Sequence, residues 1–312
     1  MWKTLAYSLR TLRRSPLFTI AAALSLALGI GANTAVFSLI DQALLKLLPV
    51  RNPESLVVLH TDYAAPGRSS SDTSETVFSY PMYRQLRDRD PAFAAVVARS
   101  GSRVTLAWRG AAEFADVEVV SGNYFQALGV GAVIGRTLTP SDDGAPGAHP
   151  VAVLADAYWA QRFGRSPGVL NQTVTMNGHP LTVVGVAEPR FKGLYSGSAP
   201  DIYVPVAMKR EADPGAWSIE EPQYRWLNIF ARLKAGFPLA KAQAATDVVY
   251  RSVLADELAH IGKMRSARAR DEFLNHRAQL RPAAQGINEL RQRWRDPLLV
   301  LMGMSGLVLL IG

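Results

Sequence analysis

No cysteine occurs among the 312 residues of this sequence, which excludes structural disulfides and thiolate metal sites. The five histidines show no paired spacing typical of a zinc site; they are His60, His149, His179, His260 and His276. Glu257 and His260 have the helical spacing of a metal pair, but one pair alone does not complete a site. A Gly-x-Ser-x-Gly nucleophile elbow is also missing. We therefore predict that the chain is not an enzyme and has no catalytic, cofactor-binding or metal-binding residue.

Acidic residues are absent before Asp41, so the N-terminus carries only positive charge. The formal net charge of the chain is +8, and the first sixteen residues supply +4 of it through Lys3, Arg10, Arg13 and Arg14. The remaining +4 is spread over 296 residues, which is too dilute for a nucleic-acid surface. We expect no nucleic-acid partner.

A long apolar stretch without charge occupies residues 17–40, a run of 24 residues. A helix needs about 20 such residues to cross the hydrocarbon core of a bilayer. Gly29 and Gly31 weaken a water-exposed helix, whereas in a membrane helix they let a neighbouring helix approach closely. The alternatives are a buried helix of a soluble domain and a signal peptide, but no clean Ala-x-Ala cleavage site follows. We predict a transmembrane helix over residues 17–40, with both glycines as helix-packing positions.

The leader, residues 1–16, has the pattern of a basic amphipathic helix. Trp2, Leu5, Leu9 and Leu12 recur at steps of three and four residues. Because Lys and Arg beside a span are retained in the cytoplasm, we expect the leader on the inner membrane surface and the following region outside. The alternative is a frayed, positively charged leader, without a stable helix, whose only role is to set the orientation of the following span in the membrane.

A second uncharged stretch occupies residues 297–312. Its sixteen residues fall short of a full crossing, and no polar flank follows, so we interpret it as the start of a second transmembrane helix that is cut off. Arg291, Arg293 and Arg295 precede it on the predicted outer side, against the usual charge bias. The first helix usually dominates orientation, so we keep the assignment.

Between these stretches, residues 41–296 are long enough for one large domain or two lobes. Predicted strands cover residues 56–60, 104–109, 113–120, 151–154, 173–176, 181–186, 201–206 and 226–233. Predicted helices cover residues 121–129, 156–163 with Asp156 as N-cap, 239–260, and a segment that starts after Ser79. Asn177 and Gly178 predict a type I′ hairpin turn, and residues 61–76 a mobile loop. The pattern is that of a mixed α+β domain.

Two glycine- or acid-rich segments are weak candidates for a ligand site. Residues 129–137 resemble a phosphate-binding loop, but Val130 stands where a glycine is required and Arg136 where a lysine is required. A glycine-punctuated turn is the prediction there. Asp142 and Asp143 are not followed by the alternating acids of a calcium loop, which favours a solvated turn.

Short motifs occur in a fixed order along nearly the whole chain. They lie at residues 15–19, 27–37, 79–83, 120–125, 135–137, 150–154, 158–159, 177–178, 183–186, 230–236 and 242–244. In this order they resemble the first span and the MacB-like periplasmic core domain of MacB/FtsX-type ABC transporter permeases, in particular the duplicated permeases of acidobacteria and related soil bacteria.

The resemblance implies an architecture. Residues 41–296 are expected to form an extracytoplasmic (periplasmic) α+β domain of two lobes, with mixed sheets and helices. This domain lies between transmembrane helix 1 at residues 17–40 and the truncated start of transmembrane helix 2 at residues 297–312. The cytoplasmic leader, residues 1–16, precedes it, and the chain is expected in the cell (inner) membrane.

The resemblance also implies partners. Such permeases transmit ATP hydrolysis by a separate or fused ATPase to the outer domain. No ATPase module is present here, so we expect ATP on a cytoplasmic ABC ATPase subunit and no cofactor in this chain. The membrane and a second permease, in a homodimer or a permease pair, are the other expected partners. Arg10, Arg13 and Arg14 are expected near the membrane and the ATPase.

The function implied is that of a permease subunit in an export, efflux or mechanotransmission system. The alternative is a membrane-anchored extracytoplasmic binding or sensor module without transport. A tethered hydrolase requires a nucleophile–base pair that the sequence lacks. Exporters of drugs, peptides, lipids and lipoproteins share this architecture, so the substrate stays open.

Overall fold

The computed structural model describes residues 46–61, 76–195, 199–261 and 266–287, together with residues 16, 17, 19, 20, 24, 27, 30, 31, 34, 38, 300, 303 and 304. The chain divides into two units, residues 1–46 with 288–312, and residues 47–287. In the first unit every described position except Lys46 is helical, and Thr34 Oγ1 donates a hydrogen bond to Ile30 O (2.8 Å). Among the residues described, no helix has the length and apolar character needed to cross a membrane.

Several predictions concern positions that the structure does not describe. Residues 1–15 of the leader, most of both predicted spans, and the domain boundaries at residues 41 and 296 lie outside the described residues. The same holds for residues 62–75 of the predicted loop. These assignments stay predictions.

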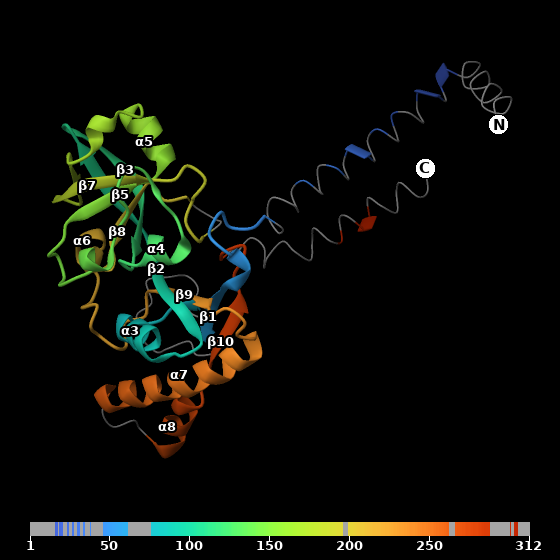
Figure 1. Ribbon diagram of the computed structural model, residues 1–312, viewed down its shortest axis with the longest axis vertical. Helices are drawn as coiled ribbons and strands as arrows, with labels where there is room; N and C mark the ends of the chain where they lie inside the picture. Colours follow the sequence, from blue (N-terminus) through green and yellow to red (C-terminus); the bar gives the residue numbers. More distant parts are fainter. Residues whose placement is uncertain are drawn as a thin grey trace. The chain divides into compact units, whose positions relative to one another are not determined.

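Six elements of the second unit form what we call the ferredoxin-like lobe (Figure 1). They are β1 (Leu56–Thr61), α3 (Tyr80–Arg89), the first part of β2 (Phe93–Trp108), β9 (Asn228–Leu233), α7 (Leu239–Ile261) and β10 (Ala278–Pro282). The strands lie in the order β10-β1-β9-β2, and every neighbouring pair is antiparallel. This is the order of a ferredoxin-like βαββαβ unit. A further helix, α8 (Ala267–Leu274), precedes β10.

The other elements come between β2 and β9 in the sequence and form the inserted lobe (Figure 1). They are β3 (Ala111–Val120), α4 (Tyr124–Leu128), β4 (Ala132–Gly135), β5 (Val151–Leu154), α5 (Asp156–Phe163), β6 (Thr173–Met176), β7 (His179–Ala187), β8 (Ile202–Pro205) and α6 (Lys209–Ala212). The strand order is β3-β8-β5-β7-β4, with β6 beside β2 and β7. Parallel pairs (β3 with β8, β5 with β7) occur beside antiparallel ones, so the α+β class is correct.

Strand β2 joins the two lobes into one sheet. It has 16 residues and pairs with β9 in the ferredoxin-like lobe and with β3 and β6 in the inserted lobe. The expected mixed sheets are therefore one mixed sheet, because this strand continues a single hydrogen-bonded sheet of ten strands through both lobes.

Local sequence signals explain most helix ends. Ser79 Oγ accepts the Met82 amide at the start of α3 (3.4 Å), as predicted. Gly164 ends α5 in the left-handed region (φ 57°). The predicted N-cap Asp156 is wrong by one residue: Ala155 is the N-cap, and the Asp156 carboxylate instead accepts two hydrogen bonds from Arg165 (both 2.7 Å).

The predicted hairpin between β6 and β7 is confirmed. Asn177 (φ 48°) and Gly178 (φ 87°) both have the positive φ that a type I′ turn requires. Asn177 Oδ1 also accepts the Thr105 amide of β2 (2.9 Å), so the turn attaches this hairpin to the central strand. The turn residues thus set both the local register and a tertiary contact.

Candidate functional site: the chain-end junction and the interlobe cleft

Most residues that we predict to act at the membrane are not among the residues that the structure describes. Arg10, Arg13, Arg14 and Gly29 lie outside the described residues. Gly31 is helical, and a Cβ added there meets no described atom within 4 Å, so its packing role stays a prediction. The site described below therefore lies in the second unit.

The segment with the weak phosphate-loop resemblance has a structural role. Gly129 ends α4 in the left-handed region (φ 72°), as the predicted turn requires. Arg136 donates to both carboxylate oxygens of Asp142 (2.6 and 2.9 Å), which occupies the guanidinium that a phosphate would need. Asp142 is buried, and the half-buried Asp143 accepts the amides of Gly122 (3.2 Å) and Ala207 (3.1 Å), so the expectation of a solvated turn is wrong for both residues.

Glu257 and His260 do not act as a pair. The buried Glu257 carboxylate accepts two hydrogen bonds from Arg225 Nη2 (3.0 and 2.9 Å). His260 Nδ1 instead contacts the Asp256 carbonyl oxygen of its own helix (2.8 Å). Burial raises the pKa of Glu257, and the charge of Arg225 opposes that rise. In the described part of the chain, no three His, Asp or Glu side chains gather as metal ligands.

The two ends of the second unit meet, in a region that we call the chain-end junction (residues 47–51 and 283–287, with Leu128 and Leu194). The Leu48 amide donates to the Ala284 carbonyl oxygen (2.8 Å). The Arg51 amide donates to Leu128 O at the end of α4 (2.8 Å), and the Ile287 amide donates to Leu194 O (2.9 Å). Each end is therefore bonded to the inserted lobe, while β1 and β10 continue from the same ends into the ferredoxin-like lobe.

Arg232 strengthens this junction from β9. Its Nη1 donates to Asn52 O (2.9 Å) and to Ser55 Oγ (2.6 Å), which lie between the first chain end and β1. Its Nε donates to Ala127 O in α4 (3.0 Å). One guanidinium thus ties the entering chain, the ferredoxin-like lobe and the inserted lobe together.

A buried polar network lies where the lobes join, and we call it the interlobe network. Arg99 Nε of β2 donates to Glu118 Oε1 of β3 (2.6 Å), and the two side chains are 10 % and 2 % exposed. Arg99 Nη1 donates to Asn228 Oδ1 of β9 (3.0 Å), and Asn228 Nδ2 donates to Thr76 O (3.0 Å). Tyr124 OH of α4 donates to the same Glu118 oxygen (3.2 Å). The network satisfies buried charge across five segments, namely β2, β3, β9, α4 and the segment that contains Thr76.

Burial and the Glu118 charge keep the neighbouring phenols neutral. Both raise the pKa of Tyr124 well above its usual value, with burial as the larger cause. Burial likewise raises the pKa of Tyr203, whose ring packs 5.1 Å from Phe125. The Tyr124 and Tyr203 hydroxyls therefore stay protonated across the physiological pH range.

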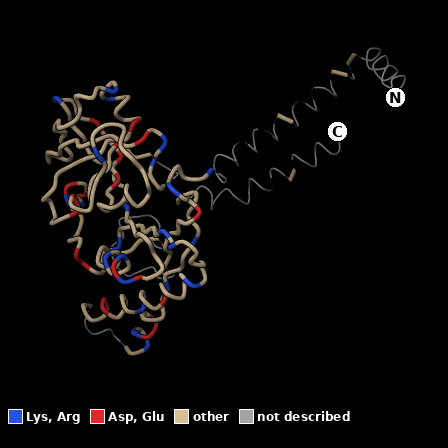
Figure 2. The backbone as a smooth tube through the Cα atoms, in the orientation of Figure 1, with Lys and Arg blue, Asp and Glu red and all other residues tan. Residues whose placement is uncertain are grey.

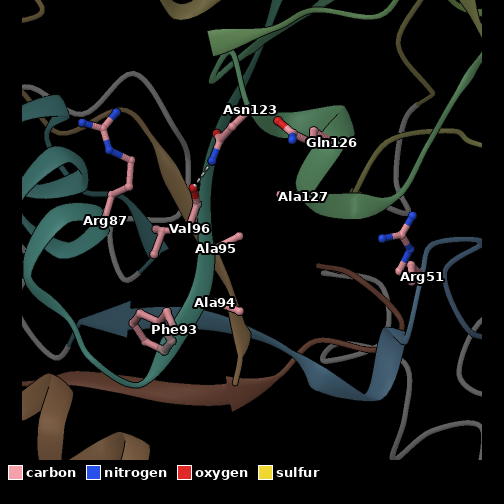
Figure 3. Close-up of a pocket in the computed structure, with 9 residues that line it drawn as sticks. All are labelled: Arg51, Arg87, Phe93, Ala94, Ala95, Val96, Asn123, Gln126 and Ala127. Atoms are coloured by element: carbon pink, nitrogen blue, oxygen red, sulfur yellow. Dashed lines mark hydrogen bonds between the residues drawn. The ribbon is translucent and has the colours of Figure 1, made fainter. Parts of the chain in front are cut away.

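An open cleft of about 460 Å³ lies beside this network (Figure 3). Its lining comes from both lobes: Arg51, Arg87, Phe93, Ala94, Ala95, Val96, Asn123, Gln126 and Ala127. Figure 3 shows residues 93–96 of β2 running between Arg87 on one side and Arg51 on the other. The described lining includes two arginines and no acidic residue.

The sequence analysis did not identify any of these features. Glu118 lies in an alternating segment typical of a solvent-facing strand, and Arg99 follows a run of small apolar residues. An unusual signal was available, because Glu118 stands directly between Val117 and Val119, and Arg99 directly follows the apolar residues 92–98. Their pairing depends on strand register, which only the fold determines.

Comparison with known proteins gives the following likenesses. The family model described as MacB-like periplasmic core domain matches residues 19–248. The extracellular domain of the noncanonic ABC-type transporter YknZ from Gram-positive bacteria is 15 % identical, covers 72 % of this chain and 99 % of that domain, and has a TM-score of 0.47. The periplasmic region of MacB from Actinobacillus actinomycetemcomitans is 17 % identical and has a TM-score of 0.46. Its alignment covers 71 % of this chain and 93 % of the MacB region. No curated protein matches the chain.

Proposed function

This chain belongs to the family of ABC transporter permeases with a MacB-like periplasmic core domain, and from that premise we propose that it is the permease subunit of an export or mechanotransmission system. A partner ATPase hydrolyses ATP on the cytoplasmic side, and the chain carries the resulting movement to residues 47–287 outside. The chain itself binds no nucleotide.

One observation supports this proposal beyond family membership, namely the chain-end junction. Both ends of the domain enter at one place, joined by the Leu48–Ala284 hydrogen bond. Each end also contacts the inserted lobe, through Arg51 to Leu128 and through Ile287 to Leu194. A displacement of the two ends therefore reaches both lobes at once, as a transmission device requires.

The continuous sheet supports the same function. Strand β2 is shared by both lobes, and the interlobe network bonds β2 to β3 and β9. The domain therefore resists bending where the two lobes join. A stiff domain converts a small shift at its base into a larger displacement at its far end. Packed interiors favour such discrete rigid movements over continuous deformation.

The membrane part of the proposal follows the sequence. Residues 17–40 and 297–312 anchor the domain in the cell membrane, with Gly29 and Gly31 packing against a neighbouring helix. Arg10, Arg13 and Arg14 lie on the cytoplasmic surface beside the ATPase. The assembly contains two permease chains, either identical or paired.

The test is reconstitution of the full protein in lipid, with and without the ABC ATPase encoded beside it. We expect a stable complex with ATP turnover that rises when both proteins are present. Because the chain has no cysteine, cysteines introduced at positions 248 and 166, in place of Val248 and Ser166, can each carry a spin label. The labels measure distances within the domain and from the domain to the membrane part. The distance between them within one chain should stay constant during turnover, while distances to labels in the membrane part change. If no ATPase associates and turnover is absent, the transport proposal fails and the binding or sensor module takes its place.

A further inference from the structure

Two arginines lie close together at the chain-end junction, and no described acidic side chain pairs with either of them. Arg51 is exposed, and Arg232 is half-buried on β9. Burial, and after it the positive charge of Arg51, lowers the pKa of Arg232, so the two guanidinium groups are near enough to repel each other. Among the residues that the structure describes, no carboxylate lies within ion-pair distance of either group. The pair therefore concentrates positive charge at one point of the junction.

Neutral acceptors hold Arg232 in place beside Arg51. Its Nε and Nη1 atoms donate to Ala127 O, Asn52 O and Ser55 Oγ, which carry no net charge. Its Nη2 atom is buried and has no hydrogen-bond partner in the described part of the chain. These bonds fix the guanidinium without cancelling its charge. An anion that binds next to two fixed cations offsets the repulsion between them.

Arg51 presents its side chain to the interlobe cleft (Figure 3). The side chain runs over Gly129, since a Cβ added to Gly129 would lie 2.7 Å from Arg51 Cβ and 3.4 Å from Arg51 Cζ. The exposed Gln126 also lines the cleft, and its amide can donate a further hydrogen bond. Arg87, on the other side of the cleft, is already paired with Asp88 (2.7 Å). An anion in the cleft is therefore drawn to the Arg51 side.

Basic residues also outnumber acidic ones in the three segments that run through the chain-end junction (Figure 2). Residues 46–55, 188–195 and 277–287 contain six Lys or Arg and two Glu. One of these acids, Glu188, accepts the Gly131 amide (3.0 Å). The surroundings therefore add to the positive potential of the arginine pair.

The junction lies within reach of the predicted membrane surface. Leu47, whose side chain is 42 % exposed, follows the end of the first predicted span by seven residues, at most about 25 Å of extended chain. Ile287 precedes the second predicted span by ten residues, at most about 35 Å. Arg291, Arg293 and Arg295 fall in that stretch, and their charge on the outer side opposes the usual bias. Basic residues beside a membrane attract anionic lipid head groups, which gives this charge a function.

We propose that the Arg51 side of the interlobe cleft binds the phosphate of an anionic phospholipid from the outer leaflet of the cell membrane. The Arg51 guanidinium donates to the phosphate oxygens, Gln126 donates to the head group, and the charge of Arg232 strengthens the attraction. The cleft volume of about 460 Å³ accommodates a head group of glycerol size. This inference goes beyond the proposed transport function, because it rests on the predicted spans and not on ATP hydrolysis. A lipid bound here ties the chain-end junction to the bilayer.

The experiment measures lipid binding to the full protein in a mild detergent by native mass spectrometry. The probes are phosphatidylglycerol and phosphatidylcholine with the same acyl chains, added at equal concentrations. We expect phosphatidylglycerol to bind at least tenfold more tightly. Arg51→Gln should weaken phosphatidylglycerol binding by roughly tenfold or more, because a charge-assisted hydrogen bond is lost. Arg51→Lys should weaken it less, because the positive charge remains.

A matched control variant and a competing anion make the result specific. Arg268→Gln removes an arginine that is 89 % exposed on α8 and should leave lipid binding unchanged. Both glutamine variants should keep the thermal midpoint of the unchanged protein, because neither arginine is buried. Millimolar inorganic phosphate should displace little phosphatidylglycerol, because a lipid in the same micelle as the protein has a high effective concentration.

Three outcomes would overturn the inference. Equal binding of phosphatidylglycerol and phosphatidylcholine would exclude selection by charge. Equal losses for Arg51→Gln and Arg268→Gln would show diffuse attraction to a basic surface. Full displacement of the lipid by millimolar inorganic phosphate would identify a site for a free anion instead of a lipid head group. None of these readouts depends on ATP turnover, so the proposed transport function is tested separately.

Discussion

Arg99 and Glu118 form a diagonal ion pair across β2 and β3, with 2.6 Å between Nε and Oε1, at the place where the ferredoxin-like lobe joins the inserted lobe. The register pairs Arg99 with Val120 and Gly101 with Glu118, so the two side chains reach each other across one face of the sheet. The pair is almost fully removed from solvent. The ion pair therefore specifies how the two lobes join.

Removing one partner of this pair should be costly. Arg99→Met or Glu118→Leu leaves the other charge buried and unpaired, and we expect each to lower the free energy of unfolding by about 3–5 kcal/mol. The double variant should cost clearly less than the sum, because no unpaired charge remains. Chemical denaturation of the full protein in detergent, arranged as a double-mutant cycle, measures the coupling. Additive losses would contradict a direct pairing.

Gly286 should be intolerant of a side chain because of the chain-end junction. Its φ is 75°, and an added Cβ lies 2.4 Å from Leu194 O, the atom that accepts the Ile287 amide. Gly286→Ala should therefore weaken the junction and reduce the ATPase stimulation that the full complex shows. Gly236→Ala is the matched control, with φ 72° and no atom within 4 Å of the added Cβ. Gly236→Ala should lower the free energy of unfolding by only about 1 kcal/mol, because of its left-handed backbone conformation, and should leave the ATPase stimulation unchanged.

His60 should make the domain less stable in acid. Burial, with a smaller contribution from the charge of Arg281, lowers its pKa to about 4 from an ordinary value of 6.5. The unfolded chain therefore takes up a proton at higher pH than the folded one. Stability is full above pH 6.5 and is lost as the pH falls toward 4, by up to about 3 kcal/mol.

The measurement is a series of thermal midpoints between pH 7 and pH 4, for the unchanged protein and His60→Leu. The unchanged protein should lose roughly 6–12 °C more than the variant over this interval. The buried Nδ1 of His60 has no hydrogen-bond partner among the described residues, so leucine removes no satisfied contact at that atom. Parallel curves for the two proteins would refute the assignment.

Two ion pairs that differ in burial should differ sharply in strength. Arg225 and Glu257 are 3 % and 4 % exposed, whereas Arg84 and Glu220 are 42 % and 52 % exposed. Arg225→Met should cost about 3–5 kcal/mol, since it leaves a buried carboxylate unpaired. Arg84→Met should change stability by about 1 kcal/mol or less. Urea denaturation of both variants compares them, and equal losses would show that burial does not control their contribution.

Much of the fold was predictable from local sequence. Short, mostly apolar runs predicted β1, β5, β7 and β8, and the capping of α3 by Ser79 followed from its side chain. The Asn177–Gly178 turn was predictable because so few residues accept positive φ. The start of β2 was missed by eleven residues, since residues 93–98 (Phe-Ala-Ala-Val-Val-Ala) are a continuous apolar run that shows no alternation. Strand β10 and helix α8 were not predicted at all.

The sequence by itself determined the class of the chain: an α+β region with a basic leader and an uncharged stretch before it, without cysteine, in a motif order that identified the family. These properties are local, because propensity, capping and charge depend on near neighbours. Only the tertiary structure decided the chain-end junction and the interlobe network. Arg99 reaches Glu118 and Asn228, which are 19 and 129 residues away, because of strand order and register. Contacts at such separations result from the packing of the whole sheet, and no local pattern encodes them.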